Sequence, residues 1–181
     1  MTLAIEALDA ASELEFETAV APLFEGAPRF LARLGAARPF GNWVNLFAAA
    51  RSIVHAMPEQ EQLELVDAHP RLGAPPALVS KLSFGEQGYD RDLAATVAAD
   101  AARERDRLAT ELERLNREYE STFGFRYCVF VAGRTRSELL PDMRGALARE
   151  RDSELHRALD AVVDIAIDRH RALTEAEVPN A

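Results

Sequence analysis

The pairing of His69 with Pro70 is the feature of this sequence best suited to proton-transfer chemistry. A proline disfavours the helical conformation of the residue before it, so we expect His69 at a helix end or in a turn. The pKa of an unperturbed imidazole suits general acid–base catalysis near neutral pH. A histidine held at such a place can equally serve only the structure, and the backbone context leaves both interpretations open.

A second polar cluster, Ser83-Phe84-Gly85-Glu86-Gln87, follows His69 after fourteen residues and is expected to have loop character. It lies in a segment from Gly73 to Gly88 that contains several glycines and prolines, for which we predict a partly irregular connection with one helical turn near residues 78–82. Polar groups on such connections often reach a ligand. Alone, the Glu-Gln pair is a weak indication, because it is also common at exposed helix ends.

Arg169 is the third candidate, because it extends an apolar stripe. The final predicted helix places Ile165 and Ala166 on one side, and Arg169 follows them by four and three residues. A buried guanidinium must be paired. It can bind an internal carboxylate such as that of Glu86, bury its stem with its head in water, or hold an anionic ligand. The residues alone favour a structural role.

The sequence contains no recognisable set of metal ligands. None of the four histidines has His-Glu-x-x-His spacing, and we expect surface positions for His55, His156 and His170. Cys128 is the only cysteine, and its aromatic and apolar neighbours predict a buried structural thiol. We therefore predict no metal site.

Composition and charge exclude other classes. With 181 residues and 48% hydrophobic content, residues 1–181 are predicted to form a single domain, with its core over about 12–174. The net charge of −9 argues against a nucleic-acid partner. The first residues predict no secretory signal, and no apolar stretch approaches the roughly 20 residues of a membrane span. We expect a cytoplasmic protein that does not bind membranes.

Helical periodicity predicts an all-α fold: a single compact multi-helix domain of about seven to nine helices, with a long central and a long C-terminal helix. The predicted helix starts are Ser12 with its capping-box partner Glu15, Pro28 opening a helix to Gly35, Asn42, and Pro58 at the first helical position. Residues 90–121 and 136–150 follow as helices, and Asp152 or Ser153 is expected to cap the last one.

Residues 127–131 are the only strand-like run of the sequence. For this run a strand, a buried extended segment and a helix are all open.

The order of several short motifs resembles the OHCU decarboxylase family, the 2-oxo-4-hydroxy-4-carboxy-5-ureidoimidazoline decarboxylases of purine catabolism. The resemblance runs from about Phe16 to Leu173. It comprises Glu25 with Pro28, Arg38–Phe40, Ala68–Gly73, Ser83–Gln87, Leu115-Asn116 with Tyr119, Phe123–Phe125, Val131–Arg134, Glu154–Leu159 and Arg169. The combination in this order is specific, although each piece is not.

The resemblance implies an all-helical, cofactor-independent enzyme, often a homodimer, that converts OHCU, a small anionic ureidoimidazoline, into (S)-allantoin and carbon dioxide. It implies catalytic roles for His69 in proton transfer, for Glu86, and for Arg169 as the arginine of the last helix. The implied substrate-binding residues are Pro70, Ser83, Phe84, Gly85, Glu86 and Gln87, with backbone contacts from Tyr127, Cys128, Val129, Phe130 and Val131.

The sequence also departs from the family pattern. Arg29 stands where an aromatic residue is frequent, Arg126 replaces a frequent proline, and residues 88–90 differ from the usual small residues. These departures leave room for a shifted substrate. The alternatives are a related ureido-acid decarboxylase, a noncatalytic helical interaction module on the same fold, and a metal-dependent helical hydrolase that uses the four histidines.

Overall fold

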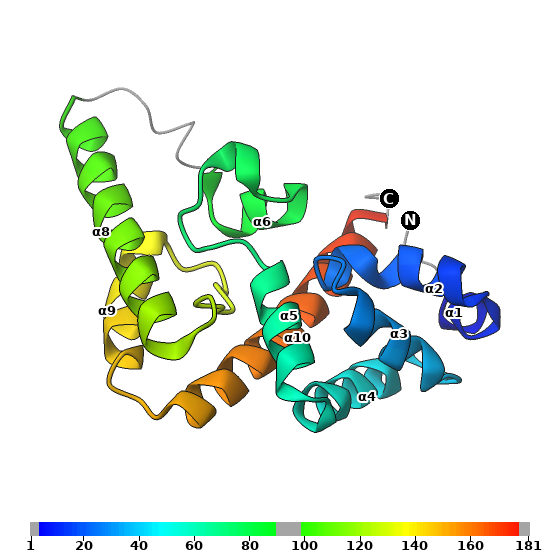
Figure 1. Cartoon of the computed structure of the whole chain (residues 1–181). Helices are drawn as coiled ribbons and strands as arrows, with labels where there is room; N and C mark the ends of the chain where they lie inside the picture. The colour runs from blue at the N-terminus through cyan, green and yellow to red at the C-terminus, as the bar shows by residue number, and fades with distance from the viewer. Residues whose placement is uncertain (1–3, 90–98, 178–181) are drawn as a thin grey trace. The chain divides into compact units, whose positions relative to one another are not determined.

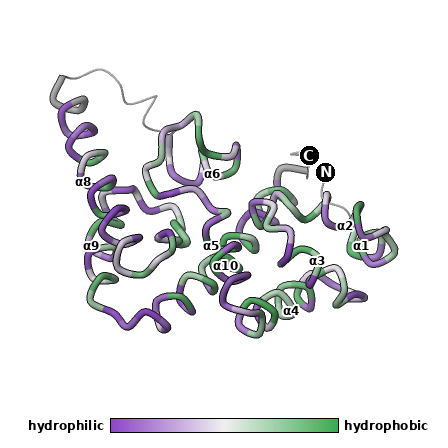
Figure 2. The backbone as a smooth tube through the Cα atoms, in the orientation of Figure 1, coloured by the Kyte–Doolittle hydropathy of each residue, from purple (hydrophilic) through white to green (hydrophobic). Residues whose placement is uncertain are grey.

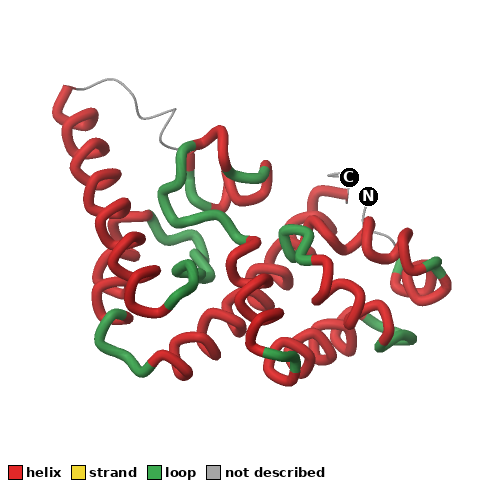
Figure 3. Tube along the Cα trace, viewed as in Figure 1, coloured by secondary structure: helices red, strands yellow, loops and turns green. Residues whose placement is uncertain are grey.

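The computed structural model describes residues 4–89 and 99–177, which form helices joined by loops, with no strand among them (Figures 1 and 3). The all-α prediction is confirmed. The chain divides into two compact units, one of residues 1–68 with 159–181 and one of residues 69–158. A single domain over the whole chain stays a prediction.

The first unit contains five of the α-helices and most of a sixth. They are α1 (Ile5–Ala10), α2 (Glu13–Val20), the 3₁₀ turn η1 (Ala21–Leu23), α3 (Pro28–Ala36), α4 (Trp43–Ala56), α5 (Glu59–Ala68) and α10 (Arg151–Glu177) from Leu159 onward. The second unit contains the 3₁₀ turn η2 (Pro76–Leu78), α6 (Lys81–Glu86), α8 (Ala99–Phe123), α9 (Arg136–Ala146) and the first turns of α10.

Local capping chemistry sets the helix starts of the first unit. Ser12 and Glu15 form the predicted capping box, and the Asn42 side chain accepts the Asn45 N–H at 2.8 Å. Pro28 opens α3 as predicted. Pro58 directly precedes α5, one residue outside its predicted position. Helix α1 was not predicted, since its six residues are too few to show a period.

Arg38 and Phe40 both serve the packing of the first unit. The Arg38 guanidinium donates to the carbonyls of Leu8 at 3.1 Å and Gly35 at 2.8 Å, and it lies over the Phe16 ring. Phe16 in turn packs against Phe40, with ring centroids 6.2 Å apart. This arginine therefore ties α1 to α2 and α3.

The second unit is built on one face of α8. Leu112, Leu115 and Tyr119 are buried at spacings of three and four residues, as the periodicity predicted. The Tyr119 ring packs against Phe123 and Tyr127 at centroid distances of 4.6 and 5.1 Å. Helix α8 runs to Phe123, two residues beyond the prediction, and residues 90–98 of the predicted helix lie outside the described residues.

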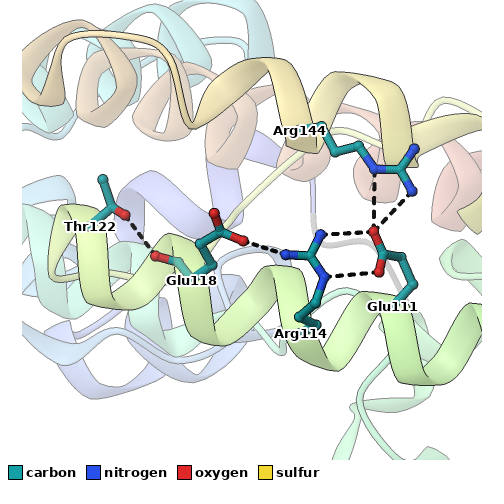
Figure 4. A network of polar contacts seen from close by, with 5 residues as sticks. All are labelled: Glu111, Arg114, Glu118, Thr122 and Arg144. Carbon is teal, nitrogen blue, oxygen red and sulfur yellow. Dashed lines mark hydrogen bonds and ion pairs between the residues drawn. The ribbon is translucent and has the colours of Figure 1, made fainter.

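The other face of α8 is a charged surface. Figure 2 shows α8 as largely hydrophilic and α4 as largely hydrophobic. Arg114 pairs with Glu111 at 2.9 Å and with Glu118 at 2.6 Å, and Arg144 of α9 also reaches Glu111 at 2.9 Å (Figure 4). Hydrogen bonds from Arg114 and then Arg144 lower the pKa of Glu111 to about 2. The network links α8 to α9.

Three boundary predictions were wrong. Residues 83–86 lie in a helix rather than a loop, because the Ser80 side chain accepts the Ser83 N–H and caps α6. Helix α9 ends at Ala146 instead of residue 150, because the chain closes into a tight turn in which Arg149 N–H donates to the Ala146 carbonyl. Helix α10 starts at Arg151, since the Glu150 carbonyl accepts the Glu154 N–H, so neither Asp152 nor Ser153 is the cap.

No described helix has the length and apolar composition that crossing a membrane requires.

Candidate active site

His69 lies directly after the last residue of α5 and is 4% exposed. Helix α5 ends before Pro70, as the proline predicted. The His69 carbonyl accepts a hydrogen bond from the Arg126 guanidinium at 3.2 Å. The imidazole is therefore a buried group on an anchored backbone, which is the setting that a proton-transfer residue needs.

The loop after His69 is held by two buried amides. Gln87, 8% exposed, accepts the Gly73 N–H at 2.8 Å and donates to the Arg71 carbonyl at 3.3 Å. Asn116 of α8 donates to the Leu72 carbonyl at 3.0 Å. These contacts fix the chain that leaves the candidate histidine and give Gln87 a structural task beside its predicted substrate contact.

Gly73 occupies the tightest point of this loop. Its φ is +78°, and a Cβ there would lie 2.7 Å from Cδ1 of Leu112. Glycine alone adopts that conformation freely and leaves that space. The glycine that ends the Ala68–Gly73 motif is therefore required by the approach of the loop to α8.

The other residues of the Ser83–Gln87 cluster belong to α6 and lie in the same unit as His69. Ser83 is 3% exposed, Glu86 is half-buried and Gly85 is exposed. The Phe84 ring packs on Tyr89 at 5.3 Å, and the Tyr89 hydroxyl donates to the Ala74 carbonyl. Tyr89 thus joins the end of α6 to the loop after His69, a contact that the sequence pattern did not indicate.

Residues 127–131 form neither strand nor helix, which decides between the three possibilities left open. Arginine side chains bind their carbonyls instead: Arg157 donates to Cys128 O at 3.0 Å, and Arg134 to Phe130 O at 2.7 Å and Val131 O at 3.0 Å. A buried irregular run needs such partners, because it has no ladder of backbone hydrogen bonds.

The side chains of this segment are mostly inside the unit. Tyr127, Cys128 and Val131 are buried, whereas Val129 and Phe130 are half-buried. Burial raises the pKa of the Tyr127 hydroxyl to about 12, so it stays protonated at neutral pH. The prediction that Cys128 is a buried thiol is confirmed.

Arg169 lies in the first unit and is 2% exposed, so the prediction that it points inward is confirmed. It donates to the Pro22 and Leu23 carbonyls at 3.0 and 3.3 Å and to the Glu25 carboxylate at 2.7 Å. The internal carboxylate is therefore that of Glu25 rather than Glu86. Glu25 has a φ of +52°, in the left-handed region that a residue with a side chain rarely adopts.

The remaining histidines divide into two kinds. His55 and His156 are exposed, as predicted, and His55 lies 3.0 Å from the Asp160 carboxylate. His170 is half-buried and stacks on Trp43 with ring centroids 3.9 Å apart, so its predicted surface position was wrong. It follows Arg169 on the inward side of α10, where an aromatic ring from α4 covers it. Within the described residues, no three acidic, histidine or cysteine side chains cluster as a metal site would require.

A cavity of about 730 Å³ lies in the second unit. Its walls are largely apolar and come from the loop after His69, the end of α6, α8 and the start of α9. Of the candidate residues, Phe84 and Gln87 line it. Its walls come from four separate segments of the chain, so no single sequence pattern indicates it.

Comparison with known proteins relates the chain to one family. The family model described as OHCU decarboxylase matches residues 9–171. The chain is 27% identical over 176 residues to a 2-oxo-4-hydroxy-4-carboxy-5-ureidoimidazoline decarboxylase of Halalkalicoccus jeotgali, an alignment that covers 95% of this chain and 92% of that protein. Its fold is similar to a crystal structure of OHCU decarboxylase in the presence of (S)-allantoin, with a TM-score of 0.65, 22% identity, and coverage of 91% of this chain and 99% of that one.

Other relatives are longer. A uric acid degradation bifunctional protein of Bacillus subtilis is 28% identical over 144 residues, which cover 80% of this chain and 27% of that protein. A second such protein, from Bacillus sp., is 26% identical over 165 residues, 91% of this chain and 31% of that protein. The chain thus spans less than a third of the length of these two relatives.

Proposed function

The chain belongs to the OHCU decarboxylase family, and we propose from this premise that it is a carboxy-lyase of urate breakdown that converts OHCU into (S)-allantoin and carbon dioxide. Relatives that bear the decarboxylase name and match over 92% of their own length support the proposal. The observation that carries it is the placement of His69, buried after α5, with α6 and residues 127–131 in the same unit.

The chemistry of the reaction suits these residue types. When the bond to the carboxylate breaks, carbon dioxide leaves and the electron pair is delocalised over the ring system. A proton must then be delivered to one face of a ring carbon to give a single enantiomer. We assign that transfer to His69, because a buried imidazole on an anchored backbone controls both the position and the direction of the proton.

The other candidates bind the substrate in this proposal. Glu86 accepts the ureido N–H groups of the substrate, and the backbone of residues 127–131 contacts the ring edge. The catalytic role of Arg169 stays a prediction. The loop held by Gln87 fixes the chain next to His69 within the second unit. We further propose a cytoplasmic homodimer, which cell fractionation and light scattering of the purified protein test.

The proposed function is tested with OHCU generated freshly from urate and followed by circular dichroism. The purified chain is expected to accelerate the decay and to give (S)-allantoin in place of the racemate. Decay at the spontaneous rate, with racemic product, would contradict the proposal. A faster decay of other ureido acids than of OHCU would instead favour the related decarboxylase.

A further inference from the structure

Glu154 is a carboxylate at the centre of the second unit, with an exposed fraction of 0%. It accepts hydrogen bonds from the Tyr119 hydroxyl at 2.9 Å, from Arg149 Nη1 at 2.9 Å and from Arg157 Nε at 2.8 Å. A carboxylate at this depth is costly unless donors surround it. Three donors from α8, the start of α10 and the turn before it make this side chain a fixed point of the unit.

The protonation state of Glu154 follows from these contacts. Burial raises the pKa of the carboxyl, but the hydrogen bonds and charge of Arg157, with those of Arg149 and Tyr119, outweigh burial and lower it. The group is therefore ionised at neutral pH. An ionised anchor holds its arginines more firmly than a neutral one would, because charge-assisted hydrogen bonds are the stronger kind.

Arg157 connects this anchor to the candidate site. One edge of its guanidinium binds Glu154, while Nη1 donates to the Cys128 carbonyl at 3.0 Å. The same guanidinium lies 5.1 Å from the centre of the Tyr127 ring. Only a planar group with donors on several edges makes these contacts at once, and a lysine ammonium at the end of a single stem does not.

From this arrangement we propose that Arg157 is a positioning residue of the decarboxylase. Held by Glu154, it fixes the Cys128 carbonyl and with it the backbone of residues 127–131, to which the proposed function assigns the contacts with the substrate ring. The proposal rests on the proposed function. It gives a role to the Glu154–Leu159 motif, to which the sequence analysis assigned none.

The chain supplies a matched control in Arg149. It donates to the same carboxylate at 2.9 Å, against 2.8 Å for Arg157, and no hydrogen bond of the described structure links it to residues 127–131. Arg149→Lys and Arg157→Lys therefore both weaken the binding of Glu154, whereas only Arg157→Lys releases the Cys128 carbonyl. A purely structural role of Arg157 predicts that both variants lose stability and that neither changes the kinetics of the folded protein.

The first test is steady-state turnover of OHCU, together with the affinity for (S)-allantoin. Arg157→Lys is expected to raise KM and weaken allantoin binding about tenfold, with kcat within about threefold of wild type, because the segment contacts substrate and transition state alike. Arg149→Lys is expected to keep the wild-type values. An unchanged KM in folded Arg157→Lys, or the same rise in Arg149→Lys, would overturn the proposal.

The second test does not depend on activity. Amide hydrogen exchange of residues 127–131 in the free protein is expected to become faster in Arg157→Lys and to stay unchanged in Arg149→Lys. If wild type fails to convert OHCU, the proposed function fails while this measurement still decides whether Arg157 holds the segment. Should Arg157→Lys not fold, Glu154→Gln is the substitute, with the same expected rise in exchange, and unaltered exchange in it would refute the proposal.

Discussion

Each unit contains a buried arginine–glutamate pair, and the two pairs differ in which partner, the cation or the anion, is more deeply buried. In the first unit the arginine is buried: Arg169 is 2% exposed, and its partner Glu25 lies nearer the surface with a 12% exposed side chain. In the second unit the carboxylate is buried: Glu154 is fully covered, and the Arg157 side chain is 27% exposed. Both arginines also donate to backbone carbonyls.

The difference separates two uses of a buried charge. In the first unit the buried cation is neutralised where it lies, by the Glu25 carboxylate, and its other hydrogen bonds go to the Pro22 and Leu23 carbonyls. An anion kept inside gathers arginines around itself, and in the second unit one of these arginines holds a backbone segment of the candidate site. The same pair of residue types therefore holds a loop of its own unit in one case, and a backbone segment of the candidate site in the other.

The largest loss of unfolding free energy is expected from Glu25→Ala, because this substitution leaves the Arg169 charge buried without its carboxylate partner. An uncompensated buried charge costs about 3–5 kcal/mol, which urea unfolding measures. The control is Glu13→Ala, at an exposed position in α2, for which we expect a change of less than about 0.5 kcal/mol. Equal losses in the two variants would show that Arg169 does not need an anionic partner.

A smaller, pH-dependent effect is expected from Glu154→Gln. At pH 7 the loss of the charged anchor is expected to cost about 1–3 kcal/mol of unfolding free energy. Because the pKa of Glu154 is lowered in the folded state, this stabilisation is complete above the unfolded value of about 4.3 and is lost as the pH falls through the folded value. Urea unfolding in steps from pH 7 to pH 3 should show that the difference in unfolding free energy between wild type and variant decreases as the pH falls. A difference in unfolding free energy that does not change with pH would argue against an ionised Glu154.

The smallest effect on stability is expected from the protonation of His170 in the first unit. Burial lowers the pKa of its imidazole, so the neutral stacked form is favoured, and its contribution to stability is lost as the pH falls through a value below 6.5. Trp43 is the only tryptophan and lies on this ring, so its fluorescence should titrate with that midpoint. His170→Gln should abolish the titration and His55→Gln should preserve it. A midpoint above 6.5 would contradict the burial argument.

Features set by neighbours in the chain were predictable from the sequence. The Ser12–Glu15 capping box, the Asn42 cap and the end of α5 before Pro70 each depend on residues within about one turn. The inward position of Arg169 also followed, because a stripe on one helix is a local pattern. The Ser80 cap was missed, since the prolines and glycines around it suggested a partly irregular chain with a single helical turn near residues 78–82.

Features set by distant partners were not predictable. Glu25 and Arg169 are 144 residues apart, and Cys128 and Arg157 are 29 apart. Periodicity shows that a charge faces inward, but it does not show which carboxylate or carbonyl meets it. Residues 127–131 looked strand-like partly for the same reason, because Arg157, which binds the Cys128 carbonyl, is distant in the sequence.

The central claim is that buried His69 transfers the proton in the decarboxylation of OHCU, and the direct measurement is the decay of fresh OHCU with His69→Ala. The variant is expected to keep the wild-type helical circular dichroism and unfolding midpoint, and to lose about 10²–10⁴-fold of the acceleration. His55→Ala, at an exposed position, is expected to act as wild type. A folded His69→Ala protein that still produces (S)-allantoin at near the wild-type rate would contradict the account.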